Sequence, residues 1–102
     1  MEVRWAPQAV QDLASIRDYI AQESASYARA VALRLYGTAG QLAQFPDSGR
    51  VVPERGDPGI RELVRAPYRI VYRRHAALIE ILTVHHAARP IPPDLGVEGG
   101  TA

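Results

Sequence analysis

Two adjacent histidines and an arginine close the most apolar run of the chain, in the segment ILTVHHAARP at residues 81–90. Imidazole and guanidinium groups can move protons or bind phosphates, so His85, His86 and Arg89 are the first candidates for chemistry. If the run is a strand, neighbouring side chains point to opposite faces, and the two histidines cannot readily bind one ion together. Since no cysteine or nearby carboxylate pair completes a ligand set, we expect no metal site. The alternative is that these residues are only the polar end of a buried strand.

Arginines form the second candidate site. Residues 50–89 carry eight arginines against four carboxylates, and the chain contains no lysine. Four of these arginines occupy alternating positions of two predicted neighbouring strands: Arg61, Arg65, Arg69 and Arg73. Placed on one sheet face, they would form a guanidinium row that binds phosphates or carboxylates in forked geometry. The competing interpretation is a solvated face with salt bridges to Glu62 and Glu80.

Motifs for nucleotide cofactors and for serine hydrolases are missing from the chain. It contains neither a GxxxxGK[ST] loop nor a GxGxxG turn, so we expect no cofactor. The segment DSGR at residues 47–50 lacks both a nucleophile elbow and a paired base. We therefore do not expect hydrolase chemistry of that kind.

Length and composition indicate one soluble domain. A chain of 102 residues can build a single core, and its 47% hydrophobic and 23% charged residues are typical of a globular protein. The first ten residues, MEVRWAPQAV, resemble neither a signal peptide nor a membrane span. Together with the absence of cysteine, this predicts a cytoplasmic protein that does not bind membranes.

Helical periodicity dominates the first half of the chain. A short strand is predicted at residues 2–5, and Pro7 suits the first turn of the helix that follows. That helix has an apolar face, which comprises Val10, Leu13, Ile16 and Ile20. Ser24 or Ser26 can cap a second helix over residues 27–44, so the two helices form a hairpin. Prolines and glycines make residues 45–59 the longest loop.

From residue 60 the period changes from helical to alternating, which predicts strands in the segments IRELVRA and YRIVYRR. The third segment, LIEILTVHH, is almost wholly apolar, as expected of a strand that is covered on both faces in the middle of a sheet. Short turns between them make an antiparallel meander. The predicted class is therefore α+β: an N-terminal strand, a two-helix hairpin and a three-stranded meander, with the helices on one sheet face. Residues 1–92 would be one domain and residues 93–102 a flexible tail.

Several segments in this order resemble the ParE branch of the ParE/RelE toxin superfamily: APQAVQDLASIRDYI, FPDSGR, IRELVRAPYRIVYRR and IEILTVHHAAR. The resemblance covers roughly residues 2–92. It implies the toxin of a bacterial type II toxin-antitoxin system with a ParD-like antitoxin as partner. Characterised ParE proteins inhibit DNA gyrase, whereas RelE proteins cleave messenger RNA on the ribosome.

The branch can be argued from chemistry. Cleavage of RNA needs a general base, a general acid and cations near the phosphate, which RelE-like enzymes supply with lysines, arginines and a late tyrosine. This chain has no lysine, and no tyrosine follows Tyr72. Its ending instead has the ParE-like pattern of Val84, His86 and Arg89. We therefore expect a gyrase inhibitor without catalytic residues; if the chain is a ribonuclease, Arg61, His86 and Arg89 are the candidates.

The resemblance also implies contact surfaces. A partly disordered acidic antitoxin would lay a helix on the hairpin and an extended segment near a sheet edge. The candidates for antitoxin binding are Leu33, Tyr36, Arg65 and Arg73. The candidates for target binding are Arg61, Arg65, Arg69, Arg73, His86 and Arg89. A third possibility is a module that binds only the antitoxin and is not toxic.

Overall fold

The computed structural model describes residues 1–89 and Ile91. The predicted tail at residues 93–102 lies outside the described residues. Within these residues, eight elements follow one another: β1 (Glu2–Trp5), α1 (Pro7–Ala21), α2 (Ala25–Gly40), the 3-10 turn η1 (Gln41–Ala43), β2 (Arg50–Val51), β3 (Ile60–Arg65), β4 (Tyr68–Arg74) and β5 (Leu78–His86). The α+β class and the order of a strand, two helices and a meander are confirmed.

Local sequence signals set the starts of both helices of the hairpin. Pro7 occupies the first position of α1, where no backbone donor is needed. Ser24 caps α2 by accepting a hydrogen bond from the Tyr27 N–H at 3.1 Å, as one of the two predicted alternatives required. The α2 helix starts earlier than the predicted residue 27, since Ser24 is its N-cap. It also ends earlier than the predicted residue 44, because the chain then tightens into η1.

The sheet contains five strands in the order β1-β5-β4-β3-β2. The three predicted strands β3, β4 and β5 form the antiparallel meander. Two pairings were not predicted. The β1 strand pairs in parallel with β5, and the two-residue β2, inside the predicted loop, pairs antiparallel with β3. Consequently β5 is an interior strand, which explains its apolar sequence.

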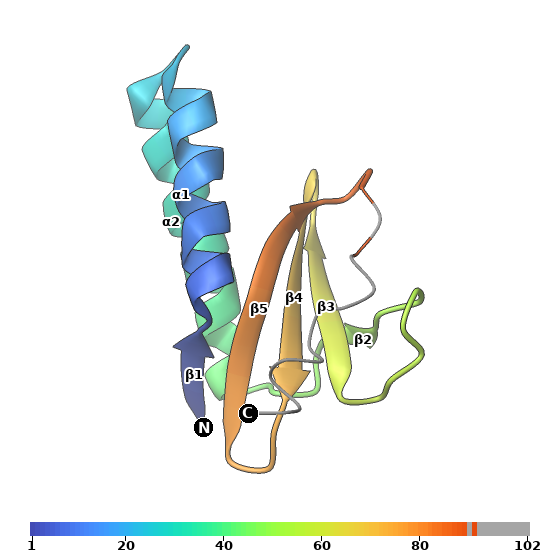
Figure 1. Cartoon of the computed structure of the whole chain (residues 1–102). Helices are drawn as coiled ribbons and strands as arrows, with labels where there is room; N and C mark the ends of the chain where they lie inside the picture. Colours follow the sequence, from blue (N-terminus) through green and yellow to red (C-terminus); the bar gives the residue numbers. More distant parts are fainter. Residues whose placement is uncertain (90, 92–102) are drawn as a thin grey trace.

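The helices form a separate layer on one side of the sheet, and the tip of their hairpin extends beyond the β3–β4 turn (Figure 1). The core between the layers contains Leu35 and Leu42 from the helical side and Ile70, Tyr72 and Ile81 from the sheet. A smaller second cluster comprises Val52, Ile60, Val71, Leu82 and Ile91. The sheet is therefore apolar on both faces.

A carboxylate joins the helical layer to the sheet. Asp12 of α1 accepts hydrogen bonds from the Thr83 hydroxyl and from the Val84 N–H, the latter at 3.2 Å. Both donors follow a β-bulge, since Val71 pairs with Thr83 and Tyr72 with Ile81, which leaves Leu82 without a partner. Asp12 thus satisfies backbone and side-chain donors at the irregular point of β5.

Candidate functional site

The prediction that four arginines of β3 and β4 form a row on one sheet face is wrong. Odd-numbered residues of β3 pair with even-numbered residues of β4, so Arg61 faces the same side as Tyr72, and Arg65 the same side as Tyr68. Arg69 pairs with Val64 and therefore lies on the opposite face. Arg73, four residues further along β4, lies on that opposite face as well. The reason is the register of the β3–β4 hairpin, which alternation within each strand does not specify.

Arg69 is the centre of a buried ionic network on the face away from the helices. Its side chain is only 7% exposed. The Nε donates to Glu62 at 2.5 Å, and the two Nη atoms donate to Glu54 at 2.8 and 2.9 Å. Glu62, whose side chain is fully buried, also accepts from Arg50 at 2.7 Å. Arg69 therefore anchors the 52–59 loop to the sheet, and its buried guanidinium is engaged by the protein's own carboxylates.

The same network shifts two pKa values. Hydrogen bonds from Arg69 lower the pKa of Glu54 from 4.5 to about 2. Partial burial acts in the opposite direction, but its effect is smaller. The carboxylates in turn raise the pKa of Arg69, which remains cationic at any physiological pH.

The Glu54 shift makes a prediction for acid stability. A carboxyl group whose pKa is lower in the folded than in the unfolded protein stabilises the native state at every pH above its unfolded pKa. That contribution disappears as the pH falls through its folded pKa. Thermal melts between pH 6 and pH 2 should therefore show a decrease in the melting temperature of the wild type, between about pH 4.5 and 2, that is missing in Glu54→Gln. Parallel curves for the two proteins would contradict the assigned hydrogen bonds.

Arg61 and Tyr72 hold the loop that precedes β2. The Tyr72 hydroxyl accepts from the Gly49 N–H at 3.0 Å and donates to the Pro46 carbonyl at 2.9 Å. Arg61 donates from Nη1 to the Gly49 carbonyl at 2.9 Å. Burial raises the pKa of Tyr72. These contacts give Arg61 a structural role in the segment FPDSGR.

At the other end of the meander, one cross-strand row remains accessible. Arg65 pairs with Tyr68, and Tyr68 pairs with His86. The His86 and Tyr68 rings meet edge to face, with centroids 6.0 Å apart. Arg65, His86 and the nearby Arg89 are all exposed. We call Arg65, Tyr68, His86 and Arg89 the sheet-end surface.

The histidines separate as the alternation predicted. His86 lies beside Tyr68, whereas His85 pairs with Arg69 on the opposite face. The Nδ1 of His86 accepts from the Ala88 N–H at 3.1 Å, so its Nε2 is the protonated nitrogen in the neutral ring. Among the described residues, no three histidine or carboxylate side chains are grouped so as to hold a metal ion.

The three residues proposed for RNA cleavage are not gathered in one place. Arg61 lies four residues before Arg65 on β3, and Arg65 is in the row of His86. At the usual rise per residue, Arg61 and His86 are therefore roughly 13 Å apart along the strands. One Arg61 donor is already used by Gly49. The arginine in the cross-strand row of His86 is Arg65, and Tyr68 lies between the two.

The outer side of α2 exposes the two apolar residues proposed for antitoxin binding. Leu33 is 58% exposed and Tyr36 is 59% exposed. Tyr36 stacks on Trp5 of β1 with ring centroids 5.7 Å apart, which fixes its position. The fourth candidate, Arg73, is half-buried and its Nη2 lies 3.6 Å from Asp57 Oδ2, so it also contacts the 52–59 loop.

The sequence indicated Glu62 as a salt-bridge partner of the arginines, but on a solvated face rather than as a buried carboxylate, and it did not indicate Glu54. One signal was available, since Glu62 falls between Ile60 and Val64 at a position where the alternation predicts the same face. A carboxylate at a core-facing position needs a buried cation. No comparable signal marked Glu54, because it lies in a loop.

The fold and its free surfaces define a small α+β protein that is suited to binding another macromolecule. No helix in the described part of the chain is long and apolar enough to span a membrane. The chain belongs to the ParE toxin family: the family model described as "ParE toxin of type II toxin-antitoxin system, parDE" matches residues 3–91. It is thus the toxin of a ParDE-like type II system.

Individual relatives agree with this family. The chain is 42% identical over 89 residues to "Toxin RelE2" of Caulobacter vibrioides, covering 86% of this chain and 97% of that protein. It is 39% identical over 92 residues to "Putative toxin Y4kP" of Sinorhizobium fredii, covering 88% and 92%. The solved "Chromosomal ParDE TA system from P. aeruginosa" superposes with a TM-score of 0.70 at 26% identity, covering 84% of this chain and 95% of that one.

Proposed function

We propose that this toxin inhibits DNA gyrase and is neutralised by a ParD-like antitoxin. The observation that carries the proposal is the separation of Arg61 from His86, which leaves the candidate ribonuclease residues unassembled. The sheet-end surface offers two exposed arginines and an exposed histidine, which suit an acidic protein surface better than they suit bond cleavage. Because gyrase is cytoplasmic, the proposal also places the toxin in the cytoplasm.

Ribosome-dependent cleavage of messenger RNA is the second candidate, because one relative is named RelE2. His86 is exposed, and Arg65 lies in its row to stabilise a phosphate. An imidazole beside guanidinium groups is chemically adequate for such a reaction. The chain offers no lysine and no tyrosine beyond Tyr72 for the second proton-transfer role.

Induction in a bacterial host distinguishes the candidates. Gyrase inhibition is expected to relax a reporter plasmid while translated messages stay intact. Cut messages on a normally supercoiled plasmid would support the ribonuclease, and His86→Ala should then abolish the cleavage. Normal growth, topology and messages in cells that contain the folded protein would support the third candidate, a module that only binds antitoxin.

Antitoxin binding is proposed on the outer side of α2. Leu33→Glu or Tyr36→Glu should weaken the complex by at least about 1 kcal/mol, or fivefold, because a charge would replace a buried apolar anchor. Titration calorimetry with the antitoxin measures the effect. Val10→Glu is the matched control, since Val10 is 53% exposed but lies on α1. Equal affinities for all four proteins would remove this surface from the proposal.

A further inference from the structure

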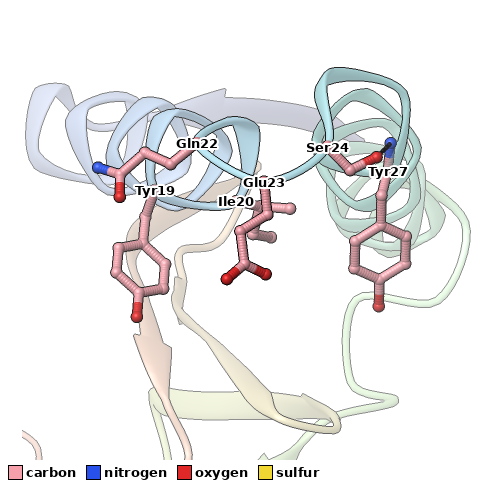
Figure 2. Close-up of a pocket in the computed structure, with 6 residues that line it drawn as sticks. All are labelled: Tyr19, Ile20, Gln22, Glu23, Ser24 and Tyr27. Atoms are coloured by element: carbon pink, nitrogen blue, oxygen red, sulfur yellow. Dashed lines mark hydrogen bonds between the residues drawn. The ribbon is translucent and has the colours of Figure 1, made fainter.

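A notch at the tip of the helical hairpin has chemistry that the proposed function does not use. It is lined by Tyr19, Ile20, Gln22, Glu23, Ser24 and Tyr27. Tyr19 comes from the end of α1 and Tyr27 from the start of α2, and Glu23 lies in the connection between them. Figure 2 shows the two rings and the Glu23 carboxylate projecting to the same side, with the carboxylate between the rings.

The walls of this notch are held in place by the turn itself. The Glu23 and Ser24 N–H groups both donate to the Ile20 carbonyl at 3.0 Å, so the chain turns tightly after α1. The Ser24 cap then fixes the first turn of α2, from which Tyr27 projects. These hydrogen bonds fix the backbone from which the lining side chains project, which lowers the entropic cost of binding a ligand there.

The notch is also unoccupied by the protein's own groups. Tyr19 is 74% exposed and Tyr27 is 60% exposed, so the protein covers neither ring. Among the described residues, Glu23 forms no ion pair. Arg17 and Arg29 are each six positions away from it in the sequence, and Arg17 pairs with Asp18 at 3.0 Å. The hairpin tip extends beyond the sheet, so the sheet does not cover it (Figure 1).

Two exposed tyrosine rings on either side of a carboxylate offer a binding site for a cationic side chain. The negative face of each ring attracts a cation, and a guanidinium group can stack on a ring while it donates two hydrogen bonds to the carboxylate. Ile20 gives the notch an apolar floor for the methylene stem of the ligand. A neutral polar side chain would leave the carboxylate unpaired, and an acidic one would be repelled.

We propose that this notch binds one arginine or lysine side chain of the antitoxin. The proposal rests on the proposed function for the identity of the partner. A partner that folds on the toxin can reach both the outer side of α2 and the hairpin tip, because disordered chains wrap large surfaces. The cation is then an anchor for the segment that passes the tip.

The first test uses the isolated toxin and blocked amino acids, followed by NMR. N-acetyl-arginine amide should shift the resonances of the Tyr19 and Tyr27 rings saturably, with a dissociation constant in the millimolar range. The uncharged isostere N-acetyl-citrulline amide should bind at least about fivefold more weakly. Glu23→Gln should weaken the binding of N-acetyl-arginine amide to the same extent. Asp18→Asn, which changes an exposed carboxylate of α1, should leave the binding unchanged. Shifts of equal size with citrulline, or none at the two rings, would overturn the proposal.

The second test uses the complex with the antitoxin. Glu23→Gln is expected to weaken it at least about fivefold, with Asp18→Asn unchanged. If blocked arginine binds the notch but the complex is unaffected by Glu23→Gln, the assignment to the antitoxin is wrong. If the toxin forms no complex and arrests no growth, the proposed function fails instead, and the first test still decides whether the notch binds cations.

Discussion

Glu62→Ala is expected to lower the free energy of unfolding by about 3–5 kcal/mol, because it leaves the Arg69 guanidinium buried without its closest partner. The Glu62 side chain is fully buried and that of Arg69 is 7% exposed, so water cannot replace the lost carboxylate. Glu54 would retain Arg69 from one side only. Urea denaturation followed by circular dichroism measures the loss.

Two further variants separate burial of the charge from the mere presence of a salt bridge. Glu2→Ala also removes a carboxylate from an arginine, but both side chains of the Glu2–Arg4 pair are more than half exposed, so less than about 1 kcal/mol should be lost. The double replacement Glu62→Leu with Arg69→Met should recover most of the stability that Glu62→Ala loses, because no buried charge then remains unpaired. Similar losses for Glu62→Ala and Glu2→Ala would contradict the buried network.

Gly49→Ala is expected to destabilise the protein by roughly 2–3 kcal/mol through overpacking. An added Cβ would lie 2.6 Å from the Tyr72 hydroxyl and 2.6 Å from the Glu62 carbonyl. The tyrosine ring cannot retreat, since it is buried in the core and holds both Gly49 and Pro46. The substitution should therefore loosen the segment FPDSGR along with the fold.

Gly37→Ala provides the matched control for this substitution. Nothing lies within 4 Å of a Cβ built on Gly37, which is in the interior of α2. Alanine there should stabilise the protein by up to about 1 kcal/mol, because glycine is the poorer helix former. Equal decreases in the free energy of unfolding for Gly49→Ala and Gly37→Ala would contradict the overpacking expected at Gly49.

Much of the fold was predictable because it follows from local signals. The change from helical to alternating periodicity near residue 60 correctly separated the hairpin from the meander. The almost wholly apolar sequence of β5 correctly indicated an interior strand. The parallel pairing of β1 with β5 joins residues more than 70 positions apart, and no local pattern specifies it.

Long-range register also limited what could be predicted about the candidate sites. Alternation places Arg61 and Arg65 together, and likewise Arg69 and Arg73, but only the pairing of Val64 with Arg69 reveals that the two pairs face opposite sides. Cross-strand contacts also decided which arginines are already engaged, because Glu54 reaches Arg69 from a loop. The notch between Tyr19 and Tyr27 required the geometry of the turn.

The most direct test of the proposed activity is a supercoiling assay with purified components. Gyrase, relaxed plasmid and ATP are incubated with the toxin alone or with the toxin bound to its antitoxin. The proposal predicts that the free toxin prevents supercoiling, that the complex does not, and that replacing Arg65 and Arg89 with alanine weakens inhibition without unfolding the protein. Full supercoiling in the presence of excess folded toxin would contradict the proposal.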